Sequence, residues 1–181
     1  MIRLGKIGLR EIGLLTVALL TRARFGKPDV SLSANGWVAG LVASSAGCGL
    51  IPPAAAALIG VVAGGLAMWS VEWLESRMGV DDPGGAISVH AVGGIWGLLA
   101  MGLFDRLPGS SGSGQWLAQL VGVATLVGFV LPLTYGLNWL LNRISPQRVA
   151  QDGERQGMDL HELGANAYPE QVSHLEDFIQ R

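Results

Sequence analysis

The sequence contains few charged residues and a single cysteine. Asp, Glu, Lys and Arg together make up 14% of its 181 residues, whereas soluble domains carry about 25%. One cysteine, Cys48, excludes an internal disulfide and a metal site built from several thiolates. The net charge of -2 leaves no basic stripe to neutralise phosphates, so we expect no nucleic-acid partner.

Sequence motifs of enzymes are missing as well. There is no nucleophile motif, no phosphate-binding loop and no CxxC pair, and the glycine-rich stretch Gly60 to Gly65 lies inside an apolar run, where glycine serves helix packing. A metal site in the C-terminal region is conceivable, but His161 and His174 have no partner at helical spacing. We therefore expect no enzymatic activity, no cofactor and no bound metal.

Long apolar runs dominate what is present. Half of the residues are hydrophobic and 27 are glycine, which is frequent in transmembrane helices because it lets backbones approach. A bilayer-spanning helix needs about 20 predominantly apolar residues. Segments of this kind occur four times, at residues 34–51, 54–73, 86–104 and 116–141. Helix breakers separate them, namely Pro52-Pro53, Met78 to Pro83 and the Gly/Ser-rich stretch Pro108 to Gly114.

These runs predict an all-α polytopic membrane protein, with a transmembrane bundle over residues 1–141 and a polar cytoplasmic tail over residues 142–181. Lys and Arg predict its orientation because they are enriched on the cytoplasmic side. On one side of the predicted spans lie Arg22, Arg24, Lys27, Arg77, Arg143 and Arg148. The other side has only Arg106, so we expect both termini in the cytoplasm.

The first apolar run, Ile12 to Leu20, is too short for a span. At ~1.5 Å per residue it crosses about half of a ~30 Å hydrocarbon core. Arg10-Glu11, directly before the run, interrupts the helix to which the run belongs. The run is not a signal peptide either, because Thr21 to Arg24 make a poor cleavage site. We therefore expect an eroded N-terminal helix in front of the four full spans.

Tryptophan placement agrees with these spans. Trp37, Trp69, Trp73 and Trp139 fall near predicted cytoplasmic ends and Trp116 near an outer end, as interfacial aromatic residues do. Trp96 differs because it falls in the middle of a span. We expect it to pack against protein or to line a cavity.

His90 is an ionisable residue inside a predicted span. Such residues are costly in a bilayer and usually face the bundle interior or a pore. At helical spacing, Ile87, Gly94 and Gly97 lie near its face. Histidine titrates near neutral pH, which suits it to passing on a proton. The alternative is a buried histidine bonded to a neighbouring helix, with Gly93-x-x-x-Gly97 as a plain packing face.

Asp82 precedes a proline at the predicted start of the same span. This pair predicts a helix start, with Asp82 as the cap and Pro83 as the first helical residue. A structural cap without further function is the simplest interpretation of Asp82.

Several motifs together resemble the ammonium transporter/Rh family. Asp81-Asp82-Pro83 followed by Ser88 to Gly97 (SVHAVGGIWG) is similar to the tenth helix of that family. Further matches follow in the family's order at Gly26-Lys27-Pro28, Asn35-Gly36, Ala39 to Val42, Gly47-Cys48-Gly49 with Pro52, Gln115 to Leu141, Arg148-Val149, Gly157 to Leu160 and Ala167-Tyr168. The resemblance covers most of the chain, from Ile12 into the tail.

The resemblance implies a pore between two inverted halves of an eleven-helix fold, in a homotrimer in the plasma membrane (the inner membrane in bacteria). It implies that ammonia passes while two facing pore histidines relay a proton, and His90 matches the second of them. Asp82 matches a carboxylate that holds the pore helices, and Ile87 and Gly94 of the same motif would support them. A PII-type signalling protein, which regulates many bacterial members, would then be a partner of the tail.

The sequence also departs from the family. It begins in what corresponds to the seventh helix, so the first pore histidine, the pore-capping phenylalanines and the outer recruitment site are not in it. In the tail, Leu163 stands where the family usually has histidine. We expect a C-terminal fragment of an ammonium transporter, inactive unless it assembles with an N-terminal half or a full-length transporter. The alternatives are a non-transporting regulatory or assembly subunit of the membrane, or a truncated remnant.

Overall fold

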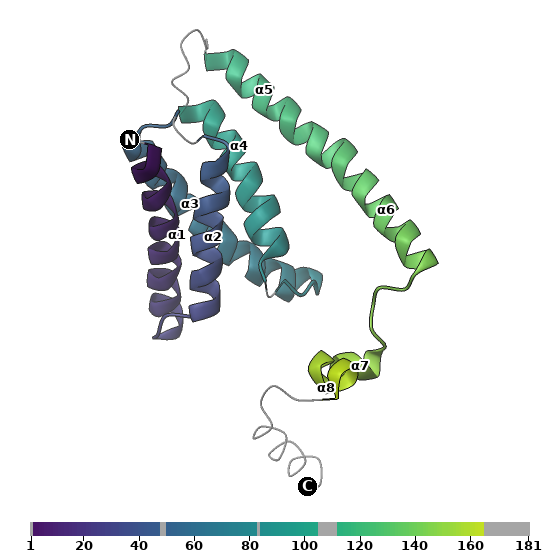
Figure 1. Ribbon diagram of the computed structural model, residues 1–181. Helices are drawn as coiled ribbons and strands as arrows, with labels where there is room; N and C mark the ends of the chain where they lie inside the picture. The colour runs from purple at the N-terminus through teal and green to yellow at the C-terminus, as the bar shows by residue number, and fades with distance from the viewer. Residues whose placement is uncertain (1, 48–49, 83, 105–111, 165–181) are drawn as a thin grey trace. The chain divides into compact units, whose positions relative to one another are not determined.

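A computed structural model describes residues 2–47, 50–82, 84–104 and 112–164, and every regular element in these ranges is helical (Figure 1). The prediction of an all-α chain is therefore confirmed. The elements in order are α1 (Ile2–Phe25), α2 (Val30–Ser45), α3 (Pro53–Trp73), η1 (Leu74–Met78), η2 (Ala86–Val92), α4 (Gly93–Phe104), α5 (Gly112–Thr125), η3 (Leu126–Val130), α6 (Leu131–Ile144), α7 (Gln151–Gln156) and α8 (Met158–Leu163). The η elements are π-helical, with hydrogen bonds that span five residues. Cys48, Pro83, Arg106, His174 and Ala167-Tyr168 lie outside the described residues.

By its internal contacts the chain separates into two units, Met1–Phe129 and Val130–Arg181. The predicted border between residues 141 and 142 concerns the edge of the membrane, and it stays a prediction.

Among the described residues, three helices are long and apolar enough to cross a membrane: Pro53–Met78, Ala86–Phe104 and Gly114–Ile144. They correspond to the predicted spans 54–73, 86–104 and 116–141. The predicted span 34–51 is shorter than expected, because α2 has 16 residues and reaches only ~24 Å. It begins at Val30 because the Asp29 carboxylate accepts the Leu32 N–H at 2.8 Å, which caps the helix.

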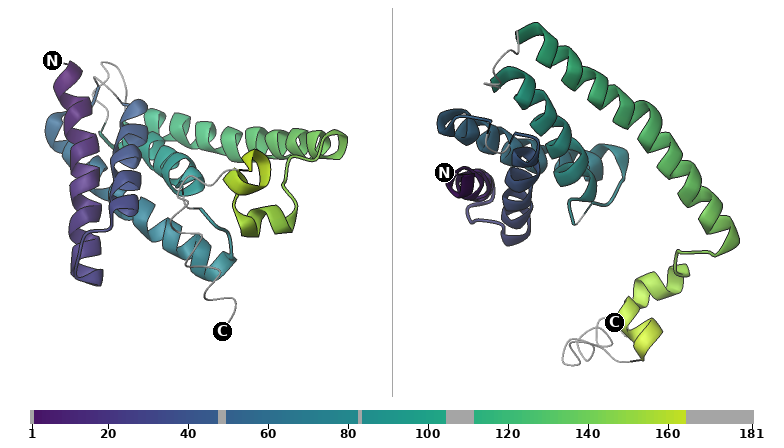
Figure 2. Two further views of the ribbon diagram at one scale, coloured as in Figure 1. Left: turned by 60° about the horizontal axis from the view of Figure 1, so that its bottom comes forward. Right: turned by 45° about the horizontal axis from the view of Figure 1, so that its top comes forward.

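Three helices of the first unit, α1, α2 and α3, pack against one another at glycine contacts (Figure 2). A Cβ on Gly13 of α1 would lie 2.3 Å from the Gly36 carbonyl oxygen of α2, and a Cβ on Gly64 of α3 would lie 2.7 Å from the Gly13 carbonyl oxygen. Backbone contacts this close leave no room for any side chain. These three glycines therefore determine how near the helices approach.

The first helix is continuous, which corrects the expectation of an interruption at Arg10-Glu11. α1 runs without a break from Ile2 to Phe25, because Arg and Glu are good helix formers and the residues after them are held by packing. Thr21 is fully buried, and its hydroxyl accepts the Asp29 N–H at 3.1 Å, which ties the end of α1 to the start of α2. Nevertheless, α1 is not among the three membrane-capable helices of the described residues.

The helix formed by η2 and α4 packs on α2 and α3. A Cβ on Gly97 would lie 2.6 Å from the Ala43 carbonyl oxygen of α2. On the other side, the Trp96 indole Nε1–H donates to the Ile59 carbonyl oxygen of α3 at 3.0 Å. The prediction that Trp96 packs against protein or lines a cavity is confirmed, and its partner is a helix backbone in the core that contains Ala39, Ala43, Ile59, Ala63 and Val89.

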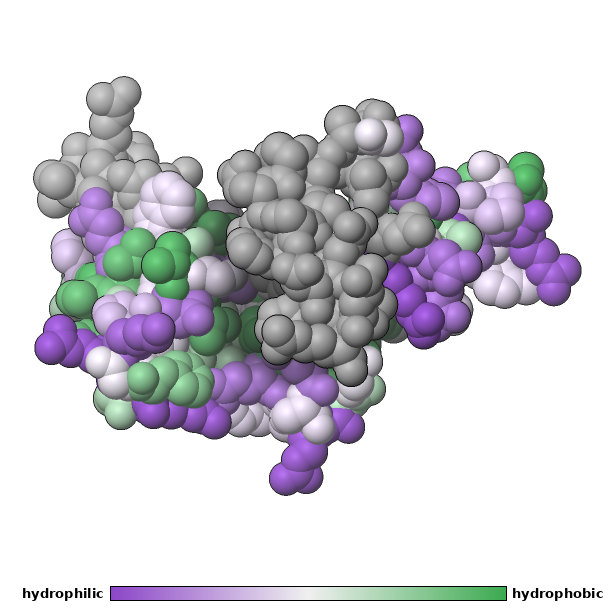
Figure 3. Space-filling model, turned by 90° about the horizontal axis from the view of Figure 1, so that it is seen from below, coloured by the Kyte–Doolittle hydropathy of each residue, from purple (hydrophilic) through white to green (hydrophobic). Residues whose placement is uncertain are grey.

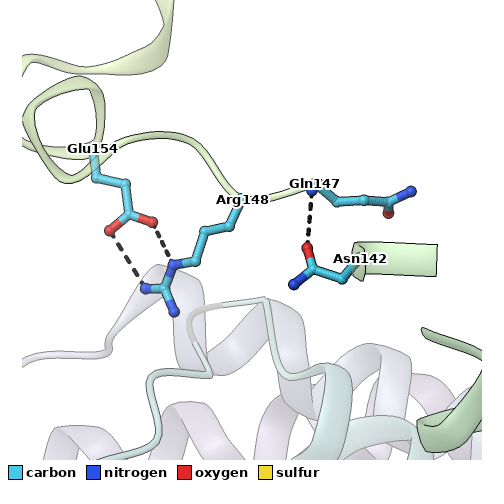
Figure 4. Close-up of polar contacts among 4 residues, drawn as sticks. All are labelled: Asn142, Gln147, Arg148 and Glu154. Atoms are coloured by element: carbon cyan, nitrogen blue, oxygen red, sulfur yellow. Dashed lines mark hydrogen bonds and ion pairs between the residues drawn. The ribbon is translucent and has the colours of Figure 1, made fainter. Parts of the chain in front are cut away.

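In the second unit, local contacts hold the connection that leaves α6 (Figure 4). The Asn142 side-chain oxygen accepts the Gln147 N–H at 3.0 Å, and the Arg148 guanidinium donates to both Glu154 oxygens, at 2.8 and 3.4 Å. The hydrogen bond and the charge of Arg148 lower the pKa of Glu154. Beyond it, a Cβ on Gly153 of α7 would lie 2.7 Å from His161 Cδ2 of α8, so these two short helices pack closely.

Candidate functional site

The start of η2 is held by the carboxylate of Asp82. Its Oδ1 accepts the Ile87 N–H at 3.1 Å and its Oδ2 accepts the Ser88 N–H at 2.9 Å. Only 4% of Asp82 is exposed. Burial raises the pKa of Asp82, but hydrogen bonds from Ser88 and Ile87 outweigh it, so the pKa lies below the ordinary 3.8. Asp82 is thus an ionised cap that accepts two otherwise unpaired N–H groups of the helix.

The capping geometry differs in detail from the prediction. The helix begins at Ala86, and Gly85, with a φ of +65°, is the residue before it. A Cβ at Gly85 would lie 2.7 Å from Val89 Cγ2 and 3.0 Å from Asn35 Cγ. Position 85 therefore requires glycine for two reasons: its backbone is left-handed, and α2 approaches it too closely for a side chain. Asp82 caps from further back, reaching forward over the Gly84-Gly85 turn.

His90 lies on the exposed face of η2. Ile87, one turn earlier, is 41% exposed on the same face, and Ala91 is also exposed. The opposite face is buried, with Ser88 at 0% and Val89 at 1% exposure. In the described part of the chain, the His90 imidazole has no hydrogen-bond partner. Within the described residues His90 is therefore neither buried nor bonded to a neighbouring helix, whereas the other part of that alternative is confirmed, because Gly93 and Gly97 do pack on α2.

The structure brings the predicted site residues together along one helix but gives them different surroundings. Asp82 binds the backbone of Ile87 directly, which fixes the turn that precedes His90. Gly94 faces α2, since a Cβ there would lie 3.8 Å from Val42 Cγ1. That distance is ordinary van der Waals contact, so position 94 has more room for a side chain than position 85 or 97 has.

Ser88 and Gly85 also belong to the site but were not predicted from the sequence. The Ser88 hydroxyl is fully buried and makes no hydrogen bond of normal geometry within the described residues, although it lies near the Asp82 carboxylate. Gly85 precedes the helix with a positive φ; a glycine pair before an apolar run is a general turn signal, but it does not tell which glycine adopts that conformation. No group of three or more His, Cys, Asp and Glu residues that could hold a metal is found in the described ranges.

Comparison with known proteins places these residues in a family context. The profile of the Ammonium Transporter Family matches residues 11–168. Ammonium transporter Amt2 of Archaeoglobus fulgidus is 37% identical over 173 residues, which cover 87% of this chain and 36% of that protein. The ammonium transporter of Bacillus subtilis is 30% identical over 155 residues, which cover 81% of this chain and 38% of the Bacillus subtilis protein.

Among solved structures, a chain named Sensor Amt Protein superposes with a TM-score of 0.81 at 25% identity. The match covers 90% of this chain and 41% of that one. The chain thus spans little more than a third of the length of the curated relatives that it matches.

Proposed function

The chain belongs to the ammonium transporter family, and we propose that it supplies one half of a pore that carries ammonium across a membrane. Transporters with inverted repeats build their path between two halves. The observation that carries the proposal is the exposed position of His90 on η2, in a helix that is otherwise packed on α2 and α3. An unpaired imidazole on the open side of a membrane bundle is suited to face a second half.

In this proposal His90 holds and passes on a proton while ammonia moves beside it. The imidazole accepts a proton at one ring nitrogen and releases one from the other, so it needs no large rearrangement. Asp82, Ile87 and Gly94 act as support. The carboxylate of Asp82 fixes the first turn of η2, Ile87 borders His90 on the exposed face, and Gly94 allows contact with α2.

We assign the chain to the plasma membrane, the inner membrane in a bacterium, with both termini in the cytoplasm. The Arg24–Glu72 ion pair joins the end of α1 to the end of α3, so Arg22, Arg24 and Arg77 belong to the same end of the first unit. Lys and Arg of short loops favour the cytoplasmic side. A homotrimer is the assembly that the family resemblance implies for the complete protein.

The test is a measurement of ammonium-evoked current in proteoliposomes. Residues 1–181 are expected to give no current alone, and to give current when co-expressed with the N-terminal helices of the Archaeoglobus fulgidus relative. His90→Ala should abolish that current without changing the amount of protein in the membrane. Current from residues 1–181 alone, or current that survives His90→Ala, would overturn the proposal.

A second candidate function is a non-transporting subunit that regulates or assembles a transporter. The observation that favours it is the tail of the second unit, where the Arg148–Glu154 pair and the Gly153–His161 contact hold two short helices together. Such a segment offers a defined surface to a partner, for example a PII-type protein. Co-purification with a full-length transporter or a PII-type protein, without any added current, would favour this function.

A further inference from the structure

A groove of about 430 Å³ runs between α1 and α3 on the surface of the first unit. Its apolar part is lined by Leu20 and Ala23 of α1 and by Gly65 and Met68 of α3. Gly65 forms an open floor, since a Cβ there would meet nothing within 4 Å among the residues that the structure describes. The groove is therefore open beside Gly65 and offers an apolar surface against which a hydrocarbon chain can lie.

One end of the groove is polar. There the Arg24 guanidinium forms an ion pair with Glu72 Oε2. The Arg24 side chain is 58% exposed, and a guanidinium has five N–H donors, so most of its donors remain available. The second oxygen of Glu72, Oε1, is buried and accepts no hydrogen bond within the described residues. An unpaired carboxylate oxygen in such a position is costly, and no N–H donor of the described residues, Arg24 included, bonds to Oε1.

Glu72 can be approached from two sides. It lines the groove and also an adjoining cavity of about 450 Å³ that includes Glu75, Asp29 and Asn35. Seen from below, this end of the bundle shows hydrophilic residues beside hydrophobic ones (Figure 3). A cationic group placed at the end of the groove would therefore meet the Glu72 carboxylate, with Glu75 one turn further along the chain.

The polar end lies at the level expected for lipid headgroups. α3 with η1 forms the membrane-capable helix Pro53–Met78, and Glu72 lies near its end. Trp69 lines the groove and stacks on Trp73 with a centroid distance of 6.0 Å. Tryptophan pairs of this kind gather at the membrane–water interface, which makes a bilayer lipid the occupant that the apolar part of the groove fits.

We propose that this groove binds a phospholipid whose headgroup carries both a phosphate and a primary ammonium, as in phosphatidylethanolamine. The phosphate accepts from the free donors of Arg24, and the ammonium donates to Glu72, which supplies the missing partner of Oε1 after a small rotation of the carboxylate. A choline headgroup has no N–H to donate, and a glycerol headgroup adds no positive charge. The site is thus selective for the amine.

The experiment measures lipid binding to the purified full chain in detergent by native mass spectrometry. Phosphatidylethanolamine, phosphatidylcholine and phosphatidylglycerol with identical acyl chains are titrated in parallel. Phosphatidylethanolamine should bind roughly tenfold more tightly than either, the difference that about 1.4 kcal/mol of charge-assisted hydrogen bonding makes. Glu72→Gln should remove this preference and favour phosphatidylglycerol, because Arg24 loses its carboxylate partner.

Two glycine variants separate groove binding from general lipid adhesion. Gly65→Leu fills the groove and should abolish the binding of all three lipids while helical content stays unchanged. Gly122→Leu, at a position on α5 that is equally open, is the matched control and should bind as the unaltered chain does. If Gly65→Leu does not fold, Ala23→Leu fills the same groove from the exposed side of α1.

Equal affinity for the three lipids, or full binding by the groove-filled variants, would overturn the proposal. So would an unaltered chain that binds no lipid but forms an oligomer which Gly65→Leu dissociates. A second copy of the chain would then occupy the groove.

Discussion

Two helices of equal hydropathy have opposite surroundings in this molecule. The most apolar 18-residue stretches of Pro53–Met78 and Gly114–Ile144 both reach a mean hydropathy of 1.9, yet within the described residues 56% of the first stretch is buried and 0% of the second. One glycine of the buried helix illustrates the difference. Gly64 of the first helix touches the backbone of α1, whereas a Cβ on Gly122 or Gly128 of the second would meet nothing within 4 Å among the described residues of the first unit. Hydropathy therefore predicts that a segment enters a membrane, but it does not predict whether protein or another medium covers it.

The largest effect should come from filling the glycine contact of the buried helix. Gly64→Ala places a Cβ 2.7 Å from the Gly13 carbonyl oxygen, and overpacking of this kind costs about 1–3 kcal/mol. The matched control is its neighbour, Gly65→Ala, where the space is open and the better helix propensity of alanine gains about 0.5–1 kcal/mol. Thermal unfolding in detergent, followed by circular dichroism, compares them. Equal stability of the two variants would contradict the glycine contact.

The next largest effect is expected at the helix cap. Asp82→Asn keeps one acceptor oxygen but loses the charge and one of the two N–H bonds, which should cost about 1–2 kcal/mol. The folded-state pKa of Asp82 lies below 3.8, so its contribution is complete above that pH and is lost as the pH falls through the folded-state value. Stability measured from neutral to strongly acidic pH should therefore fall less in Asp82→Asn than in the unaltered chain. If the stability of both proteins falls equally as the pH is lowered, the ionised Asp82 carboxylate does not stabilise the start of the helix.

A smaller effect is expected where α4 is anchored. Trp96→Phe removes the hydrogen bond to the Ile59 carbonyl oxygen while keeping most of the aromatic contact, at a cost of about 0.5–1.5 kcal/mol. Trp69→Phe serves as control because Trp69 is 58% exposed. Chemical denaturation of both variants should show a loss of stability at position 96 only.

The smallest effect is expected on the uncovered helix. Gly122→Ala meets no neighbour in the described residues, so only helix propensity acts, and stability should rise by about 0.5–1 kcal/mol. Thermal unfolding under the same conditions measures this. A clear loss of stability would mean that a covering surface, from another part of the chain or a second copy, lies against Gly122.

The sequence predicted the apolar helices well because hydropathy depends on composition alone. Ala86 to Phe104 was predicted with the same boundaries that the structure has. The length of α2 and the continuity of α1 were not predicted, because both depend on contacts between helices. A helix of 16 residues is permitted where neighbours surround it, and Arg10-Glu11 does not break a helix that Gly13 and Thr21 hold further along.

For the site, the sequence predicted the residue types but not their surroundings. His90 and Asp82 were identified from their position in or beside an apolar run. The role of Gly85 depends on a positive φ and on Asn35 of another helix, and neither follows from the local sequence. The buried hydroxyl of Ser88 was missed because a serine between Ile87 and Val89 gives no sign of which face it occupies.

The central claim is that His90 lies on a face that a second half of the transporter covers. Because Cys48 is the only cysteine, a Cys48→Ser background gives a clean probe for His90→Cys. Labelling of residues 1–181 with a thiol reagent should be rapid when the chain is alone, and suppressed when the N-terminal helices of the Archaeoglobus fulgidus relative are co-expressed. Protection of position 90 in the chain alone, or labelling unchanged by the added helices, would contradict the account.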